Sequence, residues 1–348
     1  MKPSHFIGSR VVKTGVAVFL TAWICELFDA PAVFAVITAI VTIEPTVSDS
    51  IRKGFVRFPA SAIGAAYSVF FIYLFGNSPI TYALAATLTI VTCFRLKLHA
   101  GLLVATLTAV AMVEVIHSNY FISFLIRLGT TTIGLVVSTA VNMFVLPPDY
   151  TSHITENMMA IRKRLAAKIE KVFYTVTAEQ PTAAANALKS TDVVYKKIRQ
   201  TETLIQFQKE EAKYHPLTNS EKRFFKQVEK QLTCLKLIHY HIDNVVTTRL
   251  RDDLWHDHEK KIIRQAADEL VDTFNRKTAL NQTHIRELRE LYWRENGVAS
   301  RKPDASVANF PPELIITYEL LTICQLTERF LEYGKHIKKH PKIIEQSR

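Results

Sequence analysis

An arginine inside a long apolar stretch is the residue of this chain best suited to chemistry with an anion. Arg127 is the one charged residue in the segment 121–146. At 100° per residue, several small or polar side chains fall within an arc of about 80° on the arginine's side of a helix. They are Thr131, Gly134, Ser138 and Asn142. Because a polar face gains nothing against lipid, this stripe should face other helices or water.

Other charges interrupt the apolar half of the chain at two levels. The outer group contains Glu26, Asp29 and Glu114 together with Arg127, and the inner group contains Lys13 and Glu44. A charge at the centre of a bilayer costs roughly 2.5 to 3.5 kcal/mol on insertion scales, so each should be paired or hydrated. Two interpretations stay open: pairs of purely structural value, Arg127 with Glu114 and Lys13 with Glu44, or a functional role for Arg127.

A second face of small residues occurs in the segment 59–75. Ser61, Gly64 and Ser68 recur at helical spacing, which lets another helix approach closely. Close helix packing is the expected role of this face, with the helix of Arg127 as its neighbour.

Signatures of catalysis and of cofactor binding are missing from the sequence. It contains no phosphate-binding loop, nucleophile elbow, dinucleotide fingerprint or zinc-protease motif. His239 and His241 are two residues apart on an expected helix and point to different faces, so we expect no metal there. We therefore expect a protein that is not an enzyme and that needs no metal or cofactor.

The composition divides the 348 residues into two unlike parts. Residues 1–148 contain nine Lys or Arg and five Asp or Glu, whereas the other 200 residues contain 34 and 27. The net charge of +11 does not indicate nucleic acid binding, because basic residues alternate with acidic ones along helical patterns. The four cysteines are widely separated, as expected for packed thiols in a reducing compartment.

Six apolar segments predict a membrane domain over residues 1–148. They cover residues 11–28, 30–45, 59–75, 80–94, 100–116 and 121–146. All Lys and Arg outside the segments' centres fall on alternate connections, which by the positive-inside rule places both termini in the cytoplasm. These residues are Lys2, Arg10, Lys13, Arg52, Lys53, Arg57, Arg95 and Lys97. The segment before Pro59 reads as a short amphipathic piece at the inner membrane surface.

Residues 149–348 predict a cytoplasmic antiparallel helical bundle. Charged residues mark the outer faces of long amphipathic helices, and breaks fall at Gln180-Pro181, at His215-Pro216 and in the loop from Gly297 to Pro311. The expected helices are 151–177, 183–212, 220–251, 253–295 and 312–339. The fold class is therefore all-α, with six membrane spans followed by a bundle.

The segment VFAVITAIVTIEPTVSDSIRKGFVRFPASAIGAA, residues 33–66, resembles the signature region of the aromatic acid exporter and fusaric acid resistance superfamily. The matching positions are Pro45, Ser48, Arg52, Arg57 and Gly64. The pair Pro59-Ala60 departs from the pattern, where a turn with glycine would be expected. The resemblance implies efflux of small organic carboxylates, often aromatic, and a distant likeness to plant malate channels. Because larger relatives carry the membrane unit twice, it also implies a homodimer or higher homo-oligomer.

Two functions follow as expectations. The first is a bacterial inner-membrane exporter or channel for small organic anions, with Arg127 as the attracting charge and the bilayer as its environment. The second is a membrane-anchored helical scaffold or sensor that binds a cytoplasmic partner without transport.

Overall fold

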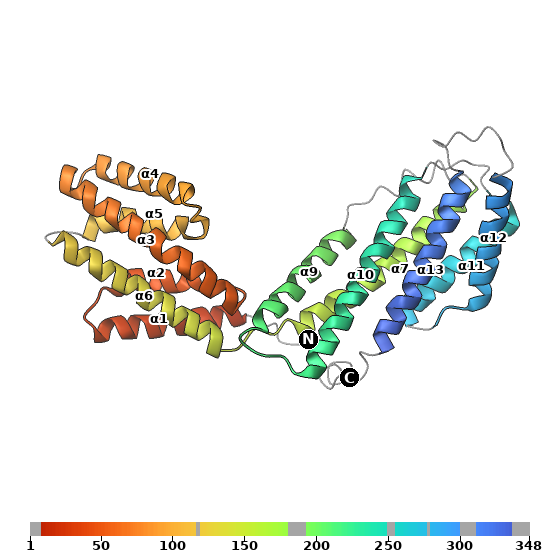
Figure 1. The fold of residues 1–348 in the computed structure, drawn as a ribbon, viewed down its shortest axis with the longest axis horizontal. Helices are drawn as coiled ribbons and strands as arrows, with labels where there is room; N and C mark the ends of the chain where they lie inside the picture. The colour runs from red at the N-terminus through yellow and green to blue at the C-terminus, as the bar shows by residue number, and fades with distance from the viewer. Residues whose placement is uncertain are drawn as a thin grey trace. The chain divides into compact units, whose positions relative to one another are not determined.

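A computed structural model describes residues 8–115, 119–179, 193–248, 255–276, 279–299 and 311–335. Every regular element in these ranges is a helix, and the helices form two compact units (Figure 1). The first unit contains Met1–Asp149 and Phe207–Pro216, and the second contains Tyr150–Gln206 and Leu217–Arg348. Some predicted features lie outside the described residues, namely Lys2, the end of the segment 100–116, residues 183–192, 249–254 and 336–339.

The first unit contains the apolar helices, and short polar residues start several of them. Thr46 accepts a hydrogen bond from the amide of Asp49 at 3.1 Å, and Ser78 stands before Pro79, where a helix tolerates proline. The helices are α1 Ser9–Leu27, α2 Ala32–Thr42, α3 Val47–Phe75, α4 Pro79–Arg95, the 3₁₀ turn η1 His99–Gly101, α5 Leu102–Val115 and α6 Tyr120–Phe144. After α6, Leu146 has a φ of 50° and Pro147 follows, so the helix cannot continue.

Helix α3 corrects the prediction of a separate amphipathic piece before Pro59. It is continuous over 29 residues, and Pro59 lies inside it. Proline removes the N–H that would bond the carbonyl of Phe55, at a cost of about 3 kcal/mol in an isolated helix. Packing overrides this local preference, because Gly54, Arg57 and Ala60 are all buried around the proline.

The first unit buries many polar side chains and exposes many large apolar ones. Buried polar side chains include Thr38, Ser61 and Thr108, whereas Phe19 and Phe70 are more than half exposed. Such an arrangement is unfavourable in water and favourable in lipid. Two described helices, α3 and α6, are long and apolar enough to cross a membrane, and three further apolar helices are shorter: Ala32–Thr42, Pro79–Arg95 and His99–Glu114. These features indicate a membrane protein.

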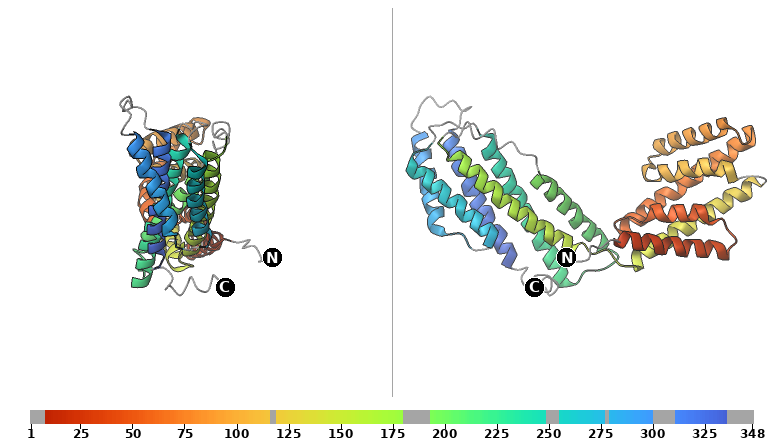
Figure 2. Two further views of the ribbon diagram at one scale, coloured as in Figure 1. Left: turned by 90° about the vertical axis from the view of Figure 1, so that its right-hand side faces the viewer. Right: turned by 180° about the vertical axis from the view of Figure 1, so that it is seen from behind.

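The second unit has one apolar core, and its long helices carry charged residues on their exposed faces. These helices run side by side as a bundle (Figure 2). Thr218 and Glu221 form a reciprocal capping box at the start of its longest helix. Phe173, Leu235 and Ile263 are among the fully buried core residues. The helices are α7 Thr151–Val176, α9 Val193–Glu211, α10 Asn219–Thr247, α11 Asp257–Arg276, α12 Gln282–Ala299 and α13 Pro312–Lys335.

The predicted helix 253–295 is wrong, since α11 and α12 occupy its place. The break has a local cause at Asn281, whose side-chain oxygen accepts a hydrogen bond from the amide of Thr283 at 3.0 Å. Asparagine competes with the helical backbone in this way and favours the first position of a new helix.

Candidate functional site

Arg127 lies in the interior of the first unit, where four helices supply its surroundings. Its side chain on α6 is only 4% exposed, and one guanidinium nitrogen, Nη2, donates a hydrogen bond to Thr108 of α5. The ring of Phe34 on α2 covers one face of the guanidinium, with 4.2 Å between Cζ and the ring centroid. A cation over an aromatic face is stabilised by roughly 2 kcal/mol when both are desolvated.

Three hydroxyl groups complete a ring of hydrogen bonds around Arg127. The Oγ atoms of Ser61 and Thr108 are 3.2 Å apart, and those of Ser61 and Thr131 are 3.4 Å apart. Thr131 donates to the backbone carbonyl of Arg127 at 2.9 Å, so its Oγ accepts from Ser61. By elimination Thr108 donates to Ser61, because each hydroxyl has one proton to give. Donation thus runs from the guanidinium through three hydroxyls back to the arginine's own carbonyl.

Two of the arginine's nitrogens remain outside this ring. Nε and Nη1 are buried and have no hydrogen-bond partner among the residues that the structure describes. An unpaired buried donor costs about 1 to 3 kcal/mol, and more when it is charged. The site therefore has a net positive charge and unused N–H groups, which is the complement of a carboxylate.

Asn142 is placed at the other end of α6 and joins three segments of chain. Its Nδ2 donates to the carbonyls of Glu44 at 3.1 Å and Thr46 at 3.3 Å and to Ser50 Oγ at 2.9 Å. Its Oδ1 accepts from Lys13 Nζ at 2.8 Å. Lys13, Glu44, Thr46, Ser50 and Asn142 are called the corner cluster below, because they surround the corner between α2 and α3.

The expected pairs of charges are corrected by these contacts. Within the described chain, Lys13 bonds Asn142, while Glu44 bonds Arg57 at 2.6 Å and Lys53 at 2.9 Å. Lys53 and Arg57 lie about two and three turns into α3 and reach back to the corner, whereas Lys13 comes from another helix. Glu114 is exposed and accepts a hydrogen bond from Tyr82 at 2.8 Å, not from Arg127. Glu26 is exposed on α1.

Small residues bring helices together, but their neighbours differ from those expected. A Cβ atom on Gly64 would lie 2.3 Å from the carbonyl oxygen of Ala105, and Ser68 donates to the carbonyl of Ala109. The face of Ser61, Gly64 and Ser68 thus packs mainly on α5, and the hydroxyl of Ser61 reaches α6 as well. On α6, a Cβ on Gly134 would lie 2.4 Å from the carbonyl oxygen of Ala35 of α2.

The stripe on α6 therefore does not form one continuous polar wall. Ser138 donates to the carbonyl of Gly134, within its own helix, at 2.6 Å. Gly134 is a packing contact, Thr131 belongs to the ring around Arg127, and Asn142 belongs to the corner cluster. The five residues face the interior of the unit, where the described structure leaves them closed off.

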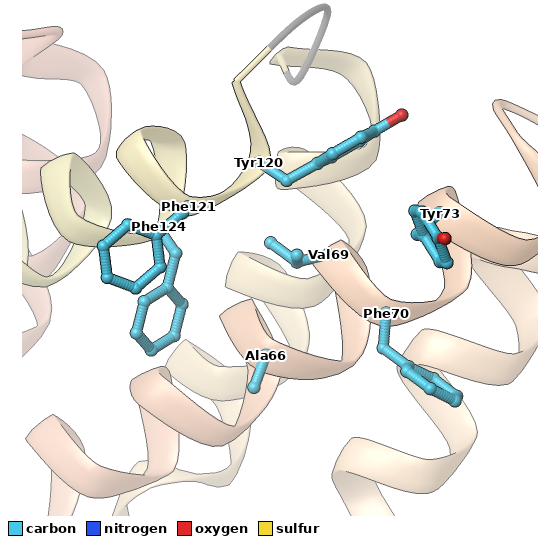
Figure 3. A pocket seen from close by; sticks show the side chains of 7 residues that line it. All are labelled: Ala66, Val69, Phe70, Tyr73, Tyr120, Phe121 and Phe124. Atoms are coloured by element: carbon cyan, nitrogen blue, oxygen red, sulfur yellow. The ribbon is translucent and has the colours of Figure 1, made fainter.

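An aromatic groove of about 440 Å³ opens at the end of the first unit remote from the corner cluster (Figure 3). The rings of Tyr73 and Tyr120 meet edge to face, with centroids 6.3 Å apart. Aromatic side chains of this kind are typical of the membrane–water interface. The lining residues are Ala66, Val69, Phe70 and Tyr73 of α3 and Tyr120, Phe121 and Phe124 of α6.

His239 and His241 of the second unit contact two different carboxylates. His239 lies 3.2 Å from Asp243, and His241 lies 2.5 Å from Glu319. Across the described ranges, no group of three or more potential metal ligands comes together.

Two residues of the arginine site were missed in the sequence. Thr108 lies on α5, where threonines and apolar residues alternate without a clear polar face. Phe34 lies in the signature region, but an aromatic residue in an apolar segment does not indicate that its ring will contact a cation. Ser50 of the corner cluster and Arg57, which bonds Glu44, both lie in the signature region, so the sequence offered a signal for each.

Fold and site together define a class: an all-helical membrane protein with a buried cationic site among its helices. Residues 5–145 match the family described as aromatic acid exporter family member 1, which indicates a transporter. A UPF0421 protein of Oceanobacillus iheyensis is 48% identical over 335 residues, 95% of this chain and 96% of the relative. UPF0421 proteins of Bacillus cereus and of Staphylococcus aureus are 43% and 41% identical, over 93% and 70% of this chain and 92% and 74% of the relatives.

The chain belongs to this UPF0421 family, and its residues 5–145 match the model of the aromatic acid exporter family. The resemblance inferred from the signature region is thereby confirmed.

Proposed function

We propose that the protein exports small organic carboxylate anions, aromatic ones among them, across the bacterial cytoplasmic membrane by a path that passes Arg127. One observation carries the proposal: a buried guanidinium whose Nε and Nη1 have no partner among the described residues. Burying a cation without a counter-ion destabilises a fold unless an anion or water completes the site. A carboxylate fits, because its oxygens accept the hydrogen bonds that the ring of hydroxyls leaves unused.

In this proposal residues 1–148 form the membrane domain, in which α1 to α6 cross the bilayer, and residues 149–348 form a cytoplasmic antiparallel bundle. Contacts between the basic ends of the helices support the orientation. Arg10 at the start of α1 donates to the carbonyl of Ile43 at 3.1 Å, and Arg57 of α3 donates to that of Ala100 at 3.3 Å. Basic ends gathered on one side favour the cytoplasm for that side.

The short helices favour more than one copy in the membrane. Helix α2 has 11 residues and α5 has 14, which correspond to about 17 and 21 Å against a hydrocarbon core of about 30 Å. Short spans are tolerated where neighbouring protein covers their ends or where the subunits associate. We propose a homodimer or higher homo-oligomer, in which the partner is a second copy of this chain.

The membrane potential alone can drive the export of an anion. A cell interior that is electrically negative favours exit of each negative charge by about 2.3 kcal/mol per 100 mV. A passive path that selects anions would therefore be sufficient, and no nucleotide-binding motif is required.

Ligand-dependent thermal unfolding of the purified protein tests the anion site. Benzoate and malate should raise the unfolding temperature of the native protein, because a ligand at about 100 times its Kd stabilises by roughly 2.7 kcal/mol. Arg127→Ala should abolish the shift, and Thr132→Ala, on the exposed side of α6, should preserve it. Equal shifts in the native protein and in Arg127→Ala would exclude Arg127 as the anion site, and the scaffold function would then be favoured.

A further inference from the structure

A buried carboxylate from beyond the membrane helices lies at the start of α3. Glu211 is 1% exposed, and its Oε2 accepts a hydrogen bond from the backbone amide of Val47, the first residue of α3, at 3.1 Å. Its Oε1 lies 2.7 Å from Nδ1 of His215. The first amides of a helix have no partner within it and carry a partial positive charge, so a carboxylate there is well placed.

Glu211 is the last residue of α9, a continuous helix whose two ends belong to different units. Residues up to Gln206 belong to the second unit, and Phe207–Pro216 belong to the first. Ile198 and Ile205 lie in the core of the second unit. Because a helix of 19 residues is about 29 Å long and stiff, a displacement at one end is transmitted to the other.

The corner between α2 and α3 is thus fixed from two sides. Asn142 holds the carbonyls of Glu44 and Thr46 from α6, and Glu211 holds the amide of Val47 from α9. Further along α3, Ser61 belongs to the hydroxyl ring around Arg127. In the described structure Glu211 is engaged and Arg127 is closed off, with 4% of its surface exposed.

We propose that the contact between Glu211 and Val47 is a latch that holds the anion path closed, and that α9 releases it when the cytoplasmic bundle changes conformation. The inference rests on the proposed function, because a passive anion path in a polarised membrane must be closed when export is not needed. Withdrawal of the carboxylate frees the start of α3, and movement of α3 opens the ring of hydroxyls at Ser61. The last two residues of α9 make the connection: Glu211 accepts from the amide of Val47 at 3.1 Å, and Glu210 accepts from the hydroxyl of Thr46 at 3.4 Å.

Benzoate efflux from proteoliposomes at a fixed membrane potential tests the latch. Glu211→Ala and Glu211→Lys should raise the efflux rate about tenfold, since one removes the carboxylate and the other repels the helix start. Glu211→Gln keeps an oxygen for the amide of Val47, and its efflux should stay nearer that of the native protein. The matched control is Glu202→Ala, which removes a carboxylate of the same helix that pairs with Lys236 at 2.7 Å; its efflux should be unchanged.

Hydrogen exchange of residues 43–50 supplies a second measurement. Exchange and efflux should rise together in Glu211→Ala, and adding Arg127→Ala should abolish the efflux. Faster exchange with unchanged efflux would show a purely structural cap and would overturn the latch. Efflux that depends on Arg127 but not on Glu211 would also overturn it while sparing the proposed function. No efflux in any variant would remove the proposed function and the latch with it.

Discussion

Within the described chain, the guanidinium of Arg127 donates a hydrogen bond through Nη2. Its Nε and Nη1 have no partner there and are available to a ligand or to water. The same side chain stacks on Phe34, which fixes the plane of the guanidinium. A planar fork with a fixed orientation selects carboxylates by geometry as well as by charge, and a lysine would supply charge alone. The residue types of the site therefore fit recognition of an anion better than simple neutralisation of a buried charge.

Asn142 was expected in the wall of the anion path, and the structure gives it contacts typical of a structural residue. Replacing it by alanine removes the side-chain acceptor of the Lys13 amine and the side-chain donor to Ser50 and to the carbonyls of Glu44 and Thr46. Asn142→Ala should lower the free energy of unfolding by about 1 to 3 kcal/mol, measured by thermal or denaturant unfolding in detergent. Benzoate binding by the folded variant should persist, and a loss of binding with unchanged stability would return Asn142 to the anion path.

Two cysteines of the second unit should resist alkylation. Burial raises the pKa of the Cys324 thiol to about 12 and also raises the pKa of Cys234. Because only the thiolate reacts, both thiols stay protonated and inert at pH 8. Mass spectrometry after maleimide treatment should find them unmodified in the folded protein and modified after denaturation. Rapid labelling of Cys324 in the native state would show that α13 is not packed as described.

Among the helices, α6 contains two glycines with opposite surroundings. A Cβ on Gly134 would meet the backbone of Ala35, whereas nothing lies within 4 Å of a Cβ on Gly129. Gly134→Ala should destabilise the protein by about 1 to 3 kcal/mol, since the backbone of α2 cannot yield as a side chain could. Gly129→Ala should be neutral or slightly stabilising because alanine favours the helix. Equal unfolding temperatures for both variants would contradict the α2–α6 contact.

The sequence predicted which segments form helices better than it predicted which residues meet when those helices pack together. The arginine's stripe on α6 follows from a period of 3.6 residues, and all five of its residues do face the interior. Which neighbour each residue meets depends on the rotation and depth of the other helices. The sequence of α6 contains no information on that geometry. For this reason Lys13 was expected to meet Glu44, although the helix that carries it presents it to Asn142.

Predictions from the local sequence were wrong where tertiary packing or a single capping residue determined where a helix begins. Pro59 predicts a helix start, yet burial on both sides of it keeps α3 continuous. Asn281 caps the start of α12 after α11 has ended at Arg276, a signal hidden inside a long amphipathic pattern. The contact of Glu211 with Val47 joins residues 164 positions apart, which no local pattern can indicate.

At the scale of the whole molecule, the proposed crossing of the membrane predicts the side on which each connection lies. Asn77→Cys, between α3 and α4, should react with a membrane-impermeant maleimide in intact cells, and Arg95→Cys, at the end of α4, should react only after permeabilisation. Both positions are exposed, and the described native cysteines are buried, so the background is low. Labelling of both positions from outside would contradict the proposed orientation.

Anion efflux through the reconstituted protein tests the central proposal most directly. Proteoliposomes loaded with benzoate, with a potential set negative inside by potassium and valinomycin, should release it faster with the native protein than without protein. Arg127→Ala should reduce the release at least about a hundredfold, the loss expected when a charged site worth roughly 3 kcal/mol is removed. Arg127→Lys should retain part of it, and Thr132→Ala all of it. Release by Arg127→Ala at the native rate, from correctly inserted protein, would contradict the account.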